Sequence, residues 1–412
     1  MAIWRAVAVF VLIATTIAPQ LISVASAERP RQSRLARILV GRNEVNRQQQ
    51  IAALSGNVAK QIKALDDLVY ALNYHAKVLA EGKEIPPSFS VLVDVVAQIN
   101  RPQAQDAVIK LLDCPRVDVS IIAADVLGKH KIYEAIEALK RQVERSEFES
   151  LYGYRFNLVR ALVRMEHPDA IEFLGKLAKR LDGQLRHELS EQLKKIDVDD
   201  FRGDEERFAA WNQARTPMLV KSASYTESYD RINLERNQYY GIDIHAKRLL
   251  FILDQSGSMN EQVASGTRLT RAKYELAYAI DGLPGDAEFG ILFFDEVVRP
   301  WREELVVASD ENKKAACQFI RRAEAGNRTN TYGALRRAME FDDQLETIFL
   351  LTDGKPTTGH IVSQGAIIDD ILRRNRTRHL TINTIGIAVE GVTESFLRNL
   401  SKHSNGEFRF PR

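Results

Sequence analysis

A nearly continuous apolar run at residues 248–253 constrains the fold more than any other feature of the sequence. Such a run is typical of a strand that is buried on both faces of a parallel sheet. Further strand-like runs alternate with segments of helical spacing through the C-terminal half, which predicts an open, doubly wound, mostly parallel sheet over residues 248–412. We expect its strands at residues 248–253, 288–294, 304–307, 347–352, 379–389 and 408–410. We expect helices around residues 269–280, 310–323, 331–341, 365–374 and 394–403.

Oxygen-bearing side chains follow the predicted strands at residues 248–253 and 347–352, and another lies in the loop at residues 326–330. Ligands of doubly wound sheets bind beyond the carboxyl ends of the strands, where such loops converge. Carboxylates and hydroxyls without His or Cys favour Mg²⁺, Mn²⁺ or Ca²⁺ over zinc or copper. The sequence therefore predicts a divalent-cation site built from Asp254, Ser256, Ser258, Thr329 and Asp353. Gly257 is expected to relax the backbone between the two serines.

The order and context of these five residues resemble the metal-ion-dependent adhesion site of von Willebrand factor A-type (VWA) domains. The resemblance covers about residues 246 to 412 and rests on Asp254 to Ser258, on Thr329 in Thr329-Asn330-Thr331, and on Asp353 after Leu350-Leu351-Thr352. Where the family normally has Gly-Gly-Thr, Asn327-Arg328 follows Gly326 here, so this loop departs from the family pattern.

The VWA resemblance implies a role for each residue of the predicted site. It implies that Ser256, Ser258 and Thr329 contact the metal, and that Asp254 and Asp353 bind it directly or through water. It also implies one open coordination position, which a carboxylate of a protein partner fills. Mg²⁺ is the expected ion, with Ca²⁺ or Mn²⁺ as alternatives.

The N-terminal half has the spacing of helices. An apolar stripe at steps of three and four predicts one long helix over residues 51–79, which packs within the chain or, alternatively, forms a coiled-coil seam. Residues 135–139 recur 35 residues later as residues 170–174, which favours stacked helical hairpins of the HEAT type over an irregular helical bundle. We therefore expect a helical domain at residues 51–197 and a linker at residues 198–247. The expected fold is α + α/β.

The first 27 residues have the layout of a secretory signal peptide: Arg5, an apolar run, and Ala25-Ser26-Ala27 before the expected cleavage site. The alternative is an uncleaved membrane anchor, which is disfavoured because the run is shorter than the roughly 20 residues that span a bilayer. Residues 28–50 form a basic segment, expected to be a solvated head; it is also the only expected place of membrane contact. We expect an exported protein that is periplasmic or secreted.

The remaining features favour a binding protein over an enzyme. The formal net charge of +2 gives no support for nucleic-acid binding. The run His187-Glu188-Leu189-Ser190-Glu191 lacks the second His of a zinc-protease motif, and phosphate-loop and serine-hydrolase motifs are absent from the sequence. We therefore expect no catalytic residue and no organic cofactor. The alternatives are a structural cell-envelope scaffold that acts through its helices and a metal-assisted hydrolase; the oligomeric state stays open.

Overall fold

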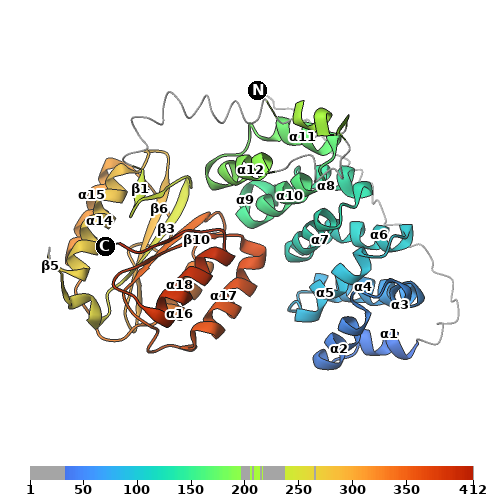
Figure 1. The fold of residues 1–412 in the computed structure, drawn as a ribbon, viewed down its shortest axis with the longest axis horizontal. Helices are drawn as coiled ribbons and strands as arrows, with labels where there is room; N and C mark the ends of the chain where they lie inside the picture. The colour runs from blue at the N-terminus through green and yellow to red at the C-terminus, as the bar shows by residue number, and fades with distance from the viewer. Residues whose placement is uncertain are drawn as a thin grey trace, which may run out of the picture.

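The computed structural model describes residues 33–195, 205–206, 208–213, 216, 237–263 and 266–411. The expected signal peptide and most of the expected linker lie outside these residues. Within them, two parts lie side by side: an N-terminal helical region and a C-terminal α/β domain (Figure 1). Among the described residues, no helix is long and apolar enough to cross a bilayer.

The N-terminal region is built of helices, as the sequence predicts. They are α1 (Arg34–Leu39), α2 (Glu44–Leu54), α3 (Val58–Lys63), α4 (Leu65–Ala80), α5 (Pro87–Ala97), α6 (Pro102–Ile109), α7 (Val117–Lys129), α8 (Ile136–Gln142), α9 (Ser146–Ser150), α10 (Tyr152–Arg164), α11 (Pro168–Leu177) and α12 (Gly183–Lys195). The described part of the basic segment contributes α1 and α2, which pack on α4 and α5. Its arginines at positions 34, 37 and 42 are exposed, as expected for solvated charges, whereas Arg47 is buried and donates from Nε to the hydroxyl of Ser88 at 2.8 Å.

The prediction of one long helix over residues 51–79 is wrong. Gly56 takes a left-handed conformation (φ 74°) after α2. Asn57 then starts α3 by accepting a hydrogen bond from the backbone N–H of residue 60 at 3.1 Å. This break turns the apolar stripe away from the core, so that Val58 and Ile62 are exposed. Gln61 is buried instead and donates to the carbonyl oxygen of Leu54 at 3.1 Å.

The helices that the 35-residue repeat equates lie against each other. Leu127 on α7 and Leu162 on α10 occupy matching positions in the repeat, and both are buried. The two helices approach so closely that a Cβ atom at Gly128 would lie 2.6 Å from the Cα atom of Ala161. This packing agrees with stacked hairpins, although the HEAT-type classification stays a prediction.

The α/β domain contains a mostly parallel sheet with the strand order β11-β10-β9-β3-β6-β7, and β8 also pairs with β6. The parallel strands are β3 (Arg248–Asp254), β6 (Glu288–Phe294), β9 (Thr347–Thr352), β10 (Thr381–Gly386) and β11 (Phe408–Arg409). The antiparallel edge is formed by β7 (Val298–Pro300) and β8 (Val306–Val307). This arrangement confirms the predicted α + α/β fold.

Helices cover both faces of the sheet (Figure 1). They are α14 (Arg268–Gly282), α15 (Asp310–Arg322), α16 (Thr331–Met339), α17 (Gln364–Arg378) and α18 (Gly391–His403). Side chains alternate along β3: Phe251 packs in the core that contains α14 and α15, whereas Ile252 packs in the core that contains α16, α17 and α18. The second core continues into the helical region, so the two parts share one hydrophobic cluster.

Two short hairpins complete the domain. They pair β1 (Gln238–Tyr239) with β2 (Ile242–Asp243) and β4 (Gln262–Val263) with β5 (Gly266–Thr267). Tyr239 is buried against Phe251 and Phe349 in the core under α14, at ring-centroid distances of 5.2 and 5.7 Å. Described residues of the expected linker thus contribute to the core of the α/β domain.

The helical region contacts the α/β domain at the amino ends of the central strands and along α17. Glu346, just before β9, is buried and accepts hydrogen bonds from the backbone N–H of Gln184 on α12 (2.7 Å) and of Lys247 (3.3 Å). On α10, the N–H of Tyr152 donates to the carbonyl oxygen of Asp343 at 3.0 Å. The loops at the carboxyl ends of the strands lie at the opposite edge of the sheet.

A candidate metal site at the carboxyl edge of the sheet

The five predicted site residues lie at the carboxyl edge of the sheet. Asp254 is the last residue of β3 and Asp353 directly follows β9, and these two strands are neighbours. Ser256 precedes and Ser258 lies within a short 3₁₀ turn over Gly257–Asn260, which directs the motif back over the strand ends. Thr329 lies in the loop that leads into α16.

Hydrogen bonds join four of these residues. The N–H of Ser256 donates to Asp254 Oδ1 at 2.7 Å, so the carboxylate fixes the turn that follows it. The hydroxyls of Ser256 and Ser258 are 3.3 Å apart, and Ser258 Oγ donates to Asp353 Oδ1 at 2.7 Å. The loops after β3 and β9 are therefore connected directly through their functional side chains.

Thr329 reaches the same place from a third loop. A Cβ atom built on Gly354 would lie 3.6 Å from Ser258 Oγ and 3.8 Å from Thr329 Oγ1, so both hydroxyls approach one point. The side chain of Thr357 holds this loop, because its hydroxyl accepts the N–H of Thr329 at 2.9 Å. The structure thus brings all five predicted residues together.

Two glycines allow the loops to approach each other. The N–H of Gly257 donates to the carbonyl oxygen of Asn327 at 2.9 Å, and the N–H of Gly326 donates to that of Gln255 at 2.6 Å. A Cβ atom at Gly257 would lie 3.2 Å from two carbonyl oxygens of the other loop. Gly257 does not take a left-handed conformation, so its role is this close approach and not the expected relaxation of the backbone.

Asp254 is an ionisable group without exposure to water. Its Oδ2 accepts a hydrogen bond from the hydroxyl of Thr352. Burial raises the pKa of Asp254 to about 7; the hydrogen bonds from Thr352 and Ser256 oppose this shift, and the charge of Asp353 adds to it. A bound cation would relieve the cost of this buried carboxylate.

Asp353 is paired with an arginine of the same chain. Arg268, the first residue of α14, donates from Nη1 to Asp353 Oδ2 at 2.9 Å, and its Nη2 lies 2.6 Å from Glu261 Oε2. The side chain of Asp353 is fully buried and that of Arg268 is 15% exposed. A permanent positive charge thus stands beside the candidate metal ligands.

Sequence reasoning did not identify three residues that shape the site: Thr352, Asp295 and Arg268. Asp295 directly follows β6. Its backbone carbonyl oxygen accepts a hydrogen bond from the N–H of Asn330 at 2.8 Å, and this bond holds the Thr329 loop. The pKa of Asp295 is below its ordinary value: burial would raise it, but hydrogen bonds from Arg299 and from the N–H of Val297 lower it by more. Its position after a buried strand was an available signal; nothing in the sequence marks Arg268.

The donor set fits a hard divalent cation. The site combines three hydroxyls and two carboxylates, and these are the oxygen ligands that Mg²⁺ and Ca²⁺ take in proteins. A buried carboxylate with a raised pKa is the group that a cation would stabilise. Across the described residues, no group of three or more His, Cys, Asp or Glu side chains is placed to hold a metal ion.

Comparisons with known proteins agree with the fold of the C-terminal domain. Residues 247–410 match the family model of the von Willebrand factor type A domain. Human von Willebrand factor A domain-containing protein 3A is 30% identical over 167 residues, which are 40% of this chain and 13% of that protein. Human inter-alpha-trypsin inhibitor heavy chain H1 is 30% identical over 172 residues, which are 39% of this chain and 18% of that protein. The match thus spans a small part of these relatives.

Solved structures with a similar domain include a von Willebrand factor type A protein from Catenulispora acidiphila. It has 24% identity and a TM-score of 0.36, over 41% of this chain and 40% of that one. An aerotolerance-related membrane protein from Bacteroides fragilis has 19% identity and a TM-score of 0.32, over 40% of this chain and 91% of that one. On the family match and the sheet described above, residues 247–410 of this chain are a von Willebrand factor type A domain that follows an N-terminal helical region.

Proposed function

We propose that this chain is an exported, non-enzymatic binding protein whose VWA domain holds a divalent cation, Mg²⁺ in the first place. The ligands would be Asp254, Ser256, Ser258, Thr329 and Asp353, and the target would be an acidic side chain of a protein partner. When bound, the cation would supply a positive centre on which such a carboxylate can complete the coordination shell. The observation that carries the proposal is the convergence of three hydroxyls beside the buried carboxylates of Asp254 and Asp353.

The protein's own residues prepare the site for a cation. Asp254 orients the turn through the N–H of Ser256, and Thr352 fixes the second oxygen of its carboxylate. Ser258 links the loops after β3 and β9 by its bond to Asp353. Because backbone hydrogen bonds join the Thr329 loop to the loop after β3, the hydroxyls are held before any ligand binds.

The placement of the helical region supports a binding role. Its contacts with the VWA domain lie at the amino ends of the strands and on α17, so the carboxyl edge faces away from them. A partner could therefore reach the metal edge while the helical region stays docked. The similarity to the human relatives is confined to 13% and 18% of their longer chains, as expected for one module that occurs in different proteins.

Ser258→Ala should weaken Mg²⁺ binding at least about tenfold, because it removes both a proposed ligand and the hydrogen bond to Asp353. Loss of even an indirect partner of a metal typically costs about 10- to 100-fold in affinity. Isothermal titration of Mg²⁺ and of Ca²⁺ into the chain from residue 28 onward measures the effect. Millimolar metal must be reached, since an isolated site of this kind lacks the carboxylate of its partner.

The matched control is Ser363→Ala. Ser363 precedes α17 in the same domain, is exposed, and makes no capping hydrogen bond. Its variant should bind Mg²⁺ like the unmodified chain. Equal binding by the Ser258 and Ser363 variants, or no saturable binding by any of the three proteins, would contradict the proposed site; the helical surface would then be the place to search for partners.

Arg268→Gln should strengthen Mg²⁺ binding by about tenfold, a change of about 1.4 kcal/mol. The guanidinium neutralises Asp353 and repels a second cation beside it, and Gln removes that charge. Arg271→Gln, one turn further along α14, is the control for a general loss of positive charge from this helix. Weaker binding after Arg268→Gln would show that the arginine positions Asp353 for the metal, contrary to this expectation.

A further inference from the structure

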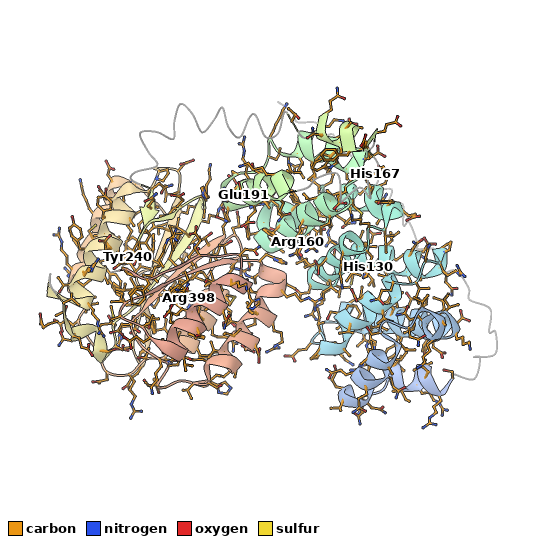
Figure 2. The ribbon with its side chains drawn as sticks, in the orientation of Figure 1. His130, Arg160, His167, Glu191, Tyr240 and Arg398 are labelled. Atoms are coloured by element: carbon orange, nitrogen blue, oxygen red, sulfur yellow. The ribbon has the colours of Figure 1, made fainter. Side chains whose placement is uncertain are left out.

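A second polar pocket lies between the helical region and the VWA domain, away from the metal edge. It has a volume of about 250 Å³, several times the roughly 30 Å³ that one water molecule occupies. Arg160 enters it from α10, on the side that faces the VWA domain (Figure 2). Arg376 and His379 enter it from the C-terminal end of α17 and the residue that follows it, and His403 enters from the end of α18.

Arg160 is the most buried cation of this pocket. Its side chain is 16% exposed, and its Nη2 donates to Asp125 Oδ1 at 2.6 Å and to Asn157 Oδ1 at 3.0 Å. Its Nε is buried and has no hydrogen-bond partner among the described residues. Burial lowers the pKa of Arg160 to about 10; Asp125 opposes this shift, and the charge of Arg164 adds to it. The protein therefore leaves this guanidinium only partly compensated.

Positive charge exceeds negative charge around Arg160. Arg164 binds the same carboxylate, since its Nη1 lies 2.9 Å from Asp125 Oδ1. Arg376 comes from the other domain and donates from Nη1 to the neutral hydroxyl of Ser90 at 2.7 Å. In this part of the described structure, two guanidinium groups thus share the carboxylate of Asp125, and a third, that of Arg376, is bonded to a neutral hydroxyl. Like charges held this close favour the binding of an anion.

His379 lies among the same positive charges. Its ring stacks on Phe156 at 4.7 Å, and its Nε2 lies 3.1 Å from Nη2 of Arg160, so Nε2 accepts a hydrogen bond in the neutral ring. Burial lowers the pKa of His379 well below its ordinary value, and the charges of Arg160, Arg164 and Arg376 lower it further. Because His379 stays neutral, the positive charge of this pocket is carried by the guanidinium groups of the arginines.

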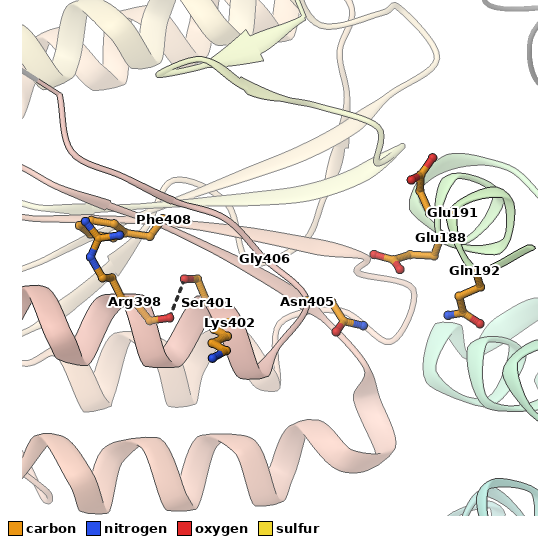
Figure 3. Close-up of a pocket in the computed structure, with 9 residues that line it drawn as sticks. All are labelled: Glu188, Glu191, Gln192, Arg398, Ser401, Lys402, Asn405, Gly406 and Phe408. Atoms are coloured by element: carbon orange, nitrogen blue, oxygen red, sulfur yellow. Dashed lines mark hydrogen bonds between the residues drawn. The ribbon is translucent and has the colours of Figure 1, made fainter. Parts of the chain in front are cut away.

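The neighbouring cleft has a different electrostatic character. It is about 660 Å³ in volume and shares Asn405 with the arginine pocket. Figure 3 shows α12 on one side of it and the end of α18 on the other. Glu188 and Glu191 of α12 offset Arg398 and Lys402 of α18, so cations and anions are matched there. The excess of positive charge belongs to the pocket of Arg160 and Arg376.

We propose that the pocket between α10 and α17 binds a small phosphate-class dianion, which the guanidinium groups of Arg160 and Arg376 hold from the two domains. Arginine forks match the oxygens of a phosphate group, and bonds between ionised partners are about twice as strong as neutral ones. An anion in this position would offset the excess charge where the helical region meets the VWA domain. It would therefore stabilise the docked arrangement of the two parts by mass action.

Titration of inorganic phosphate into the full exported chain, without divalent metal and at constant ionic strength, tests the proposal. We expect saturable binding and a rise of the unfolding temperature with phosphate. Arg376→Gln should weaken binding at least about tenfold, since one of the two forks is lost. Arg376 is exposed, so this variant should fold. Acetate at the same ionic strength should bind less tightly, because it carries one charge.

Two control variants distinguish binding of the anion by Arg376 from the loss of a neighbouring hydrogen bond and from a general loss of positive charge. Ser90→Ala removes the hydroxyl that accepts from Arg376 and keeps the charge, so phosphate binding should persist. Arg373→Gln removes an exposed arginine of the same helix that is paired with Asp370, and it should also bind phosphate normally. Absence of saturable phosphate binding, or equal binding by the Arg376 and Arg373 variants, would overturn the proposal.

A third comparison identifies the source of the phosphate group. Glycerol 3-phosphate carries the same dianion on a small organic molecule, whereas inorganic phosphate is the free ion. Tighter binding of the ester would assign the pocket to a phosphorylated metabolite or headgroup, and equal binding would assign it to the free ion. Both results support the anion site, provided that Arg376→Gln weakens the binding of phosphate and of glycerol 3-phosphate to the same extent.

Discussion

Asp254→Asn should raise the unfolding temperature of the metal-free protein at pH 8, although it removes a proposed metal ligand. The side chain of Asp254 is buried, and burial raises its pKa to about 7. At pH 8 the folded chain must therefore keep a charged carboxylate out of water, with no bound cation to compensate it. Asn has nearly the same shape and carries no charge, so the variant avoids this cost.

The sign of the effect follows from proton linkage. Between the ordinary Asp pKa of 3.8 and the folded value of about 7, the folded state keeps a proton that the unfolded state has released. The stability contributed by the protonated carboxyl is complete below the lower value and is lost as the pH rises through the upper one. The shift corresponds to an upper limit on the order of 4 kcal/mol, or roughly 10 °C for a domain of this size.

Thermal unfolding in the presence of a chelator, at pH 5 and at pH 8, measures this effect. The gain from Asp254→Asn should be larger at pH 8 than at pH 5, because the carboxyl of the unmodified chain is mostly protonated at pH 5. Burial also raises the pKa of Glu346 to about 7, but that residue is unchanged in the comparison. Saturating Mg²⁺ should stabilise the unmodified chain and leave the variant unaffected. A variant that is less stable at both pH values would contradict the expectation.

The sheet could be predicted best where its strands are fully buried. The predicted bounds of β6 and β9 agree with the structure, and β3 is one residue longer than predicted, because apolar side chains fill both faces of these strands. The strand expected at residues 379–389 is shorter, since α17 continues to Arg378 and His379 ends it in a left-handed conformation (φ 51°). Short strands such as β7 carry too few residues to show a period of two.

The candidate site was predictable as far as its residues follow the strands that carry them. Asp254, Ser256 and Ser258 lie next to each other in sequence, and Asp353 follows a buried strand, so fold class alone places them at one edge. Arg268 belongs to a helix that follows a hairpin, and only the tertiary fold brings it to Asp353. The arginine pocket could not be predicted for the same reason, because its two guanidinium groups come from residues 160 and 376, which are far apart in the sequence.

The packing of the helical region on the VWA domain depends on a close contact between two backbone segments, and sequence periodicity does not reveal this contact. Gly153, the second residue of α10, lies against the end of α17. A Cβ atom at this position would be 2.0 Å from the carbonyl oxygen of Thr377 and 3.0 Å from the Cα atom of Arg378. No side-chain rotation can relieve that contact, because the atoms it meets belong to the backbone.

Gly153→Ala should therefore destabilise the protein by about 3 kcal/mol, the upper end of the usual cost of overpacking. This cost exceeds the gain of about 1 kcal/mol that Ala brings to a helix in place of Gly. As α10 moves away from α17, the hydrogen bond from Tyr152 to Asp343 and the contact of Arg160 with His379 should weaken as well. Differential scanning calorimetry should show a lower midpoint or two separate transitions where the unmodified chain shows one.

Gly365→Ala is the matched control for Gly153→Ala. Gly365 is likewise the second residue of its helix, α17, and a Cβ atom there meets no atom of the described residues within 4 Å. This variant should be as stable as the unmodified chain or slightly more stable. Equal midpoints for the two alanine variants would show that α10 and α17 can separate at little cost. Mg²⁺ binding should survive Gly153→Ala, since the metal edge and the contact with α10 lie in different parts of the domain; loss of metal binding would instead show that the docked helical region supports the site.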